Sequence, residues 1–156
     1  MDIYECLVAD HRKVAALIDD LLAINLQHVQ QTIFTKIKIE LTAHAAAEEA
    51  TFYKAISGEA HDVHIEKDVD HAVYEHDDIR KHLEQLSEEA ATSPKWMLMF
   101  GELKHAIEHH VEQEETEVFS EARKVLGTDQ AFTLANEFIT RKQEIMAHLQ
   151  PIDAEA

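Results

Sequence analysis

The chain contains almost nothing that breaks a helix. Its 156 residues include 3 Gly and 2 Pro, and the long stretches between them are rich in Ala, Leu, Glu, Lys, Gln and Ile. Those residues favour helix, whereas Gly and Pro disfavour it. The hydrophobic content of 46% supports a globular fold with a core, and the length fits one domain. The sequence therefore predicts an all-α protein.

Apolar residues recur at helical spacing in five segments of the chain. We expect these helices over about residues 2–25, 31–57, 94–126 and from 128 onwards, with the third helix beginning between residues 60 and 67 and ending near 91. Four long helices with short links pack as an up-and-down four-helix bundle, here with an additional C-terminal helix. Residues 1–127 would form the bundle, residues 128–150 a C-terminal helix packed on the same domain, and residues 151–156 a frayed tail.

Helix ends are marked by residues with known terminal preferences. Gly58 and Gly127 are placed to end the second and fourth helices. Ser93, followed by Pro94, is placed to begin the fourth helix, and Thr128 or Asp129 to cap the fifth.

One pattern of histidines and glutamate occurs twice. A histidine is followed 33 or 34 residues later by a second histidine and then, four residues further on, by a glutamate. The first copy is His11, His44 and Glu48, and the second copy is His76, His110 and Glu114. The flanking sequences match as well, because ADHRKV parallels YEHDDI and HAAAEEATFY parallels HVEQEETEVF. Such a repeat predicts two half-sites that face each other.

These six residues are expected to meet inside the bundle. Each histidine shares its helical face with apolar residues, so all four point inward. His11 and His44 are each about 14 residues, or ~21 Å, from the turn that joins their helices, and His76 and His110 are similarly matched. Glu48 and Glu114 lie one turn beyond a histidine on the same face. The four imidazoles and two carboxylates therefore converge at one height.

A metal centre is the interpretation that best fits this set. Imidazole nitrogen and carboxylate oxygen together suit iron, manganese or zinc. Buried carboxylates without a counter-charge are costly, whereas a pair of divalent cations satisfies them and keeps the imidazoles neutral. A structural bundle whose histidines only bond one another is disfavoured by the two inward carboxylates. Ferritin-like iron storage is also disfavoured, because the Glu102 to His105 pair faces a polar surface.

The pattern resembles the H…HxxxE…H…HxxxE signature of haemerythrin-like (HHE cation-binding) domains, over about residues 3–122. The resemblance implies a four-helix bundle that holds two iron ions with an oxo or hydroxo bridge, for which manganese or zinc could substitute. It also implies that Glu48 and Glu114 bridge the two ions and that the histidines are terminal ligands.

Two departures from oxygen-carrying haemerythrins count against oxygen transport. Those proteins have a fifth histidine at the position of Ala72, and their closing carboxylate lies at the position of Glu115, which here competes with Glu114. About two of some twelve coordination positions would stay open for a small ligand. Tyr53 follows the first motif but lies nearly opposite His44 on an ideal helix, so ordinary packing is expected for it.

The predicted function is that of a di-iron protein that binds or reduces oxygen, peroxide or nitric oxide, with an electron donor that the sequence does not identify. The alternative is a regulatory binding module in which iron and oxygen occupancy controls stability or partner contact without turnover. A net charge of -17 argues against nucleic acids and anionic membranes as partners. The lone Cys6, with no apparent export or membrane segment, indicates a cytoplasmic protein. The sequence is also compatible with a homo-oligomer.

Overall fold

The computed structural model describes residues 1–149, except for the side chain of Ala60. Within that range it contains helices and no strand, which confirms the all-α prediction. The tail predicted at residues 151–156 lies outside the described residues. The elements are α1 (Ile3–Ala23), α2 (Gln27–Glu48), η1 (Glu49–Tyr53), α3 (Lys54–Ala60), α4 (Val63–Glu88), α5 (Pro94–Gln113), η2 (Glu114–Val118), α6 (Phe119–Val125) and α7 (Thr128–Leu149).

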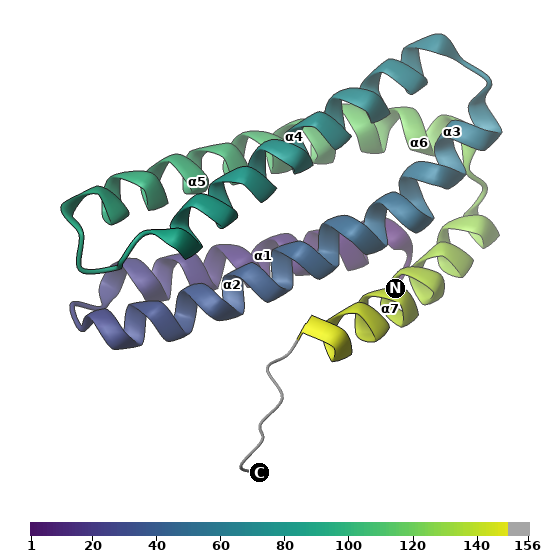
Figure 1. Cartoon of the computed structure of the whole chain (residues 1–156). Helices are drawn as coiled ribbons and strands as arrows, with labels where there is room; N and C mark the ends of the chain where they lie inside the picture. The colour runs from purple at the N-terminus through teal and green to yellow at the C-terminus, as the bar shows by residue number, and fades with distance from the viewer. Residues whose placement is uncertain (150–156) are drawn as a thin grey trace.

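Four long rods form the predicted up-and-down bundle (Figure 1). Two rods are the single helices α1 and α4. The other two are continuous runs of helix, α2–η1–α3 and α5–η2–α6, each with one π-helical segment in it. The turns from α1 to α2 and from α4 to α5 lie at the same end of the bundle, so the two hairpins run side by side (Figure 1).

Side-chain caps mark the starts of α1 and α5. Asp2 and Glu5 form a capping box at the start of α1, in which each side chain accepts from the backbone N–H of the other residue. Ser93 caps α5 as predicted, and its hydroxyl accepts from the N–H of Lys95. Neither Thr128 nor Asp129 precedes α7, because the helix already begins at Thr128.

Gly58 does not end the second rod, so that prediction was wrong. Helix α3 continues through Gly58 to Ala60, and the chain turns at His61, whose φ of 45° is left-handed. A left-handed residue after a helix is usually Gly, because Gly has no Cβ to clash there. The turn after the second rod therefore lies three residues beyond Gly58, at His61, which adopts a left-handed conformation at a cost in free energy.

Buried apolar side chains form two clusters, and the residues of the repeat lie between them. One cluster surrounds Phe52 and Phe119, and the other surrounds Trp96 and Phe100. Along every rod a histidine of the repeat separates the two clusters, as His11 does between Leu7 and Val14. The packing that holds the helices together thus continues on both sides of the polar centre.

Helix α7 packs along α1 and α2 on the outside of the bundle (Figure 1). Its buried stripe leaves out some of its large apolar residues and includes a lysine. Phe132 is 47% exposed and Ile139 is 41% exposed, whereas Lys142 is buried. The stripe comprises Ala131, Leu134, Ala135, Phe138 and Lys142. Within residues 1–149, none of the helices has the length and apolar character needed to cross a bilayer.

Candidate metal centre

The six residues of the repeat meet in the interior of the bundle. The four histidines are between 2% and 7% exposed, and both glutamates are completely buried. His11 comes from α1, His44 and Glu48 from α2, His76 from α4, and His110 and Glu114 from α5 and the first position of η2. The rings pair within each hairpin, with centroids 5.2 Å apart for His11 and His44 and 4.6 Å for His76 and His110.

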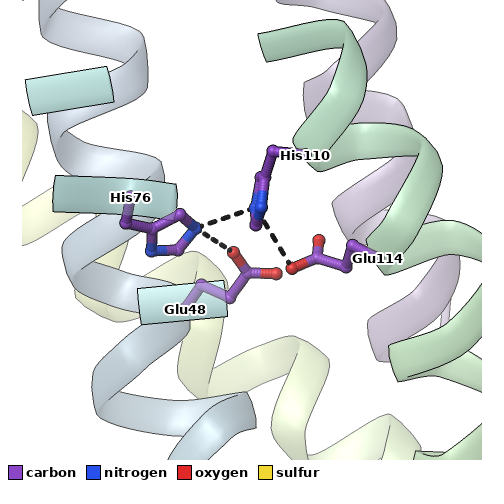
Figure 2. A group of neighbouring side chains, drawn as sticks. All are labelled: Glu48, His76, His110 and Glu114. Carbon is purple, nitrogen blue, oxygen red and sulfur yellow. Dashed lines mark hydrogen bonds and ion pairs between the residues drawn. The ribbon is translucent and has the colours of Figure 1, made fainter. Parts of the chain in front are cut away.

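Each carboxylate lies between histidines of different hairpins. Glu48 Oε1 is 3.3 Å from Nε2 of His44. It is also 3.2 Å from Nε2 of His76, and Figure 2 marks this contact with a dashed line. Glu114 is 3.2 Å from Nε2 of His11 and 3.5 Å from Nε2 of His110. The two glutamates therefore occupy central positions, and the histidines surround them.

Two groups of donor atoms are close enough to hold one cation each. One group contains Glu48, His76, His110 and Glu114, which Figure 2 shows pointing toward one another. The other group contains His11, His44 and Glu114. Because Glu114 belongs to both groups, its carboxylate stands where it can be shared by two cations.

A second layer of carboxylates, which we call the outer ring, holds the other nitrogen of every imidazole. Its members are Asp10, Glu49, Glu75 and Glu115. The Nδ1–oxygen distances are 2.9 Å for His44 with Asp10, 2.7 Å for His76 with Glu49, 2.8 Å for His110 with Glu75 and 2.7 Å for His11 with Glu115. These bonds join α1 to η2, α5 to α4, α4 to η1 and α2 to α1, and so close a circle around the bundle.

The outer ring determines what the inner nitrogens can do. An imidazole that donates from Nδ1 to a carboxylate presents the lone pair of Nε2 in its neutral form. All four Nε2 atoms point to the centre, and those of His76 and His110 are 3.0 Å apart. Within residues 1–149, Nε2 of His11 and His44, both oxygens of Glu48 and Oε1 of Glu114 are buried without a hydrogen-bond partner. Converging lone pairs and unbonded carboxylate oxygens are what a bound cation satisfies.

The buried carboxylates raise the proton affinity of the imidazoles. Burial alone would lower the pKa of His44, but Glu48 and Asp10 outweigh it and raise that pKa to about 10. Burial is likewise outweighed at His76, whose pKa Glu48 and Glu49 raise to about 9. Burial would raise the pKa of Glu48, yet the histidines hold it well below its usual value. The centre is thus anionic, and it attracts either protons or metal cations.

The two π-helical segments lie at equivalent places in the repeat. Segment η1 begins directly after Glu48, and η2 begins at Glu114. A π turn contains one more residue than an α turn, so it rotates everything that follows by about 100°. In each segment a threonine hydroxyl donates to the carbonyl four residues earlier, from Thr51 to Ala47 and from Thr116 to Glu112.

This rotation brings Tyr53 into the centre. The expectation that Tyr53 lies opposite His44 assumed an uninterrupted α-helix, and η1 ends at Tyr53. Its ring stacks on the imidazole of His76, with the ring centroids 5.4 Å apart, and its hydroxyl donates a hydrogen bond to Oε2 of Glu114. Burial and then Glu114 and Glu48 raise the pKa of Tyr53 well above its usual value, so the phenol keeps its proton.

A small enclosed cavity adjoins the four imidazoles on the side of the second apolar cluster. Its volume is about 30 Å³. Besides the four histidines, the lining includes Val14, Leu41, Ile79, Leu83 and Ile107. A single water molecule needs roughly 10–15 Å³ of such space, so the cavity suits one molecule of two or three heavy atoms.

Comparison with known proteins agrees with this geometry. The sequence model of the family described as Hemerythrin HHE cation binding domain matches residues 2–122, which include all six residues of the repeat. The chain belongs to this family. As a haemerythrin HHE domain it is a cation-binding helical protein, which confirms the resemblance seen in the sequence. Helix α7 lies beyond the matched residues.

Two proteins similar to this haemerythrin HHE chain illustrate how far the likeness extends. A DNA nickase from Nostoc sp. (strain PCC 7120) is 30% identical over 149 residues, which are 96% of this chain and 41% of that protein. The chain thus spans about two fifths of that relative. A crystal structure of a Hemerythrin HHE cation binding domain-containing protein from Mycobacterium kansasii has a TM-score of 0.82 and 20% identity, and covers 95% of this chain and 89% of that chain. That structure shares the fold.

Sequence reasoning missed the outer ring of this haemerythrin HHE domain. No role was predicted for Asp10, Glu49 or Glu75, but each of these carboxylates bonds to Nδ1 of a histidine. The signal was in the repeat, because an acidic residue precedes both His11 and His76 and a second glutamate follows both Glu48 and Glu114. Glu115, considered as a competitor of Glu114, lies in the outer ring instead.

Proposed function

We propose that this chain is a non-haem di-iron protein in which His11, His44, Glu48, His76, His110 and Glu114 hold two iron ions. The observation that carries the proposal is the set of unpartnered buried atoms that face one another from these side chains. Two donor groups that share Glu114 support a pair of ions. Mixed nitrogen and oxygen donors suit iron, and also manganese or zinc as substitutes.

We propose that the small molecule bound or reduced there is oxygen, peroxide or nitric oxide. The cavity of about 30 Å³ beside the imidazoles supports this size class. Its apolar wall of Val, Leu and Ile side chains favours an uncharged molecule and disfavours larger polar substrates. Iron, when bound, supplies the electrons or the binding site that such molecules need.

The protein's own groups would prepare the centre for this chemistry. The outer ring orients each imidazole and increases its basicity as a ligand. Glu48 and Glu114 would balance the charge of the ions. Tyr53, neutral and hydrogen-bonded to Glu114, places its phenol oxygen 3.5 Å from Nε2 of His76. The apolar side chains on both sides keep bulk water out.

Iron content and optical spectra test the proposal. Protein loaded with ferrous iron without oxygen and then exposed to oxygen or peroxide should hold about two irons per chain and gain near-ultraviolet absorption that reduction removes. Glu114→Gln should lose most of that iron, because Glu114 serves both donor groups. Glu112→Gln, a change at an exposed residue two positions away, should behave as wild type. A colourless protein with far less than one iron per chain contradicts the assignment.

A regulatory module without turnover is the second candidate. It is favoured by the way the centre joins all four rods, because metal occupancy would then control the stability of the whole bundle. Rapid peroxide consumption by iron-loaded protein would favour the enzymatic function over this one. Nicking of DNA is not proposed for this chain, because 31 acidic residues against 14 basic ones give it a net charge of -17, which repels phosphate.

A further inference from the structure

Helix α7 brings a buried lysine to the edge of the centre. Lys142 lies in the buried stripe of α7, where the helical period calls for an apolar residue, and it is 9% exposed. A buried lysine is rare unless it is paired with acidic groups. Here Nζ lies 2.8 Å from Asp10 of α1 and 2.8 Å from Glu40 of α2.

The contact with Asp10 leads directly to His44. The same oxygen, Oδ2 of Asp10, accepts from Lys142 and from Nδ1 of His44, which is 2.9 Å away. One turn before Lys142 on α7, the ring of Phe138 meets His44 edge to face, with centroids 5.4 Å apart. Helix α7 thus holds His44 in two ways, through the carboxylate on its Nδ1 and through its ring.

The other three members of the outer ring have basic neighbours that are more exposed than Lys142. Glu115 pairs with Arg12, whose side chain is 63% exposed, and Glu49 pairs with Arg80, which is 33% exposed. Glu75, the repeat's counterpart of Asp10, has His71 and His109 beside it, both more than half exposed. A cavity of about 50 Å³ adjoins Glu75 and His110. Within residues 1–149, the half of the centre at His44 is therefore the more tightly enclosed.

We propose that Lys142 is a positioning residue that, through Asp10, fixes the orientation and tautomer of His44 and so makes the two metal sites unequal. This inference rests on the proposed di-iron centre. Lys142 holds Asp10 in place as an anion, Asp10 keeps the proton of His44 on Nδ1, and Nε2 is left free to bind the cation. The exposed partners of Glu75 exert no such hold on His110.

Removal of the lysine charge tests this role. In Lys142→Met, anaerobic titration of Fe²⁺ into metal-free protein should show one of the two ions bound about 10- to 100-fold more weakly, with the other unchanged. The matched control is Lys13→Met, because Lys13 pairs with Glu40 at 2.5 Å and has no contact with Asp10 among the described residues. It should bind both ions as wild type does. Lys142→Arg, which keeps the charge, should restore the weaker site.

A second measurement in the metal-free proteins follows His44 itself. In ¹⁵N NMR of the imidazoles, Lys142→Met should shift the Nδ1 signal of His44 and speed exchange of its proton, with His110 unaffected. If Lys142→Met does not fold, Lys142→Gln is used for both measurements with the same expectations. Binding of both ions by these variants with the same affinities as the wild-type protein, or equal weakening of both ions, overturns the role of Lys142. Failure of wild-type protein to bind iron would overturn the proposed function instead.

Discussion

Each histidine of the centre uses its two ring nitrogens for different purposes. Nδ1 donates to a carboxylate of the outer ring, and Nε2 faces the interior, where its lone pair can take up either a proton or a metal cation. In the metal-free protein the buried glutamates keep protons on some of these rings, because pKa values of about 10 for His44 and about 9 for His76 lie above neutral pH. Metal and protons therefore compete for the same atoms.

This competition predicts proton release. At pH 7 the binding of divalent metal should displace about two protons, one each from His44 and His76. Isothermal titration calorimetry in buffers of different ionisation enthalpy measures that number, and the apparent affinity should increase with pH up to about 10, the pKa of His44. Binding heat that does not depend on the buffer would show that the imidazoles are already neutral.

Tyr53 offers a second test on the residue scale. Tyr53→Phe removes the hydroxyl that donates to Glu114 and leaves a buried anion with one donor fewer. The metal-free variant should lose about 1.5–3 kcal/mol of unfolding free energy in urea, and the metal-loaded variant less, because the metal also satisfies Glu114. Tyr74→Phe, at a side chain that is 69% exposed, is the control and should change little.

On the scale of elements, the π-helical segments explain where sequence reasoning stopped. Strict helical spacing placed the histidines and both glutamates together, and they do meet. It failed for Tyr53, because no residue type in the sequence indicates where a π turn adds its extra residue. It also failed for Lys142, because a lysine in a helix is normally expected to face the solvent. Only the packing of α7 on α1 and α2 shows that Lys142 forms ion pairs with Asp10 and Glu40.

The end of the second rod gives a prediction about helix stability. Gly58 lies inside α3 without a positive φ, and within the described structure a Cβ there would meet no atom within 4 Å. Gly58→Ala should therefore stabilise the protein by about 0.5–1 kcal/mol. His61→Gly should also stabilise it, by about 1 kcal/mol, because His61 has φ 45°. Thermal unfolding measures both, and destabilisation by Gly58→Ala would place the helix end at Gly58.

On the scale of the whole molecule, the centre connects all four rods between two apolar clusters. The bundle and its helix order followed from the scarcity of Gly and Pro and from apolar spacing, and both were predicted. The position of α7 on α1 and α2 was not predicted, because apolar residues occur on more than one of its faces. Phe132 and Ile139, for example, stay exposed.

Removal of metal should lower the stability of the entire bundle. The chelated protein is expected to melt at a lower temperature than metal-loaded protein, because only the folded state holds the six ligands together. The sign of the pH dependence follows from the raised pKa values of His44 and His76. Their contribution to the unfolding free energy of the metal-free protein is complete below pH 6.5, the ordinary pKa of histidine. It is lost as the pH increases through about 9 to 10, the pKa values in the folded state.

The difference in melting temperature between the two forms should consequently widen from pH 6.5 to pH 9. Differential scanning calorimetry of chelated and reloaded samples measures it. Equal melting temperatures at every pH would mean that the six side chains do not hold metal in the folded state.

The closed circle of imidazole–carboxylate bonds has a mechanical consequence. Neighbouring rods cannot separate or slide at that height without breaking a hydrogen bond between Nδ1 and a partly buried carboxylate. The circle of bonds therefore restrains the separation of the four rods at the level of the centre. Breathing motions are then confined to the two ends of the bundle. Amide protons next to His44 and His110 should exchange with solvent more slowly than those near the interhelical turns, even in protein stripped of metal.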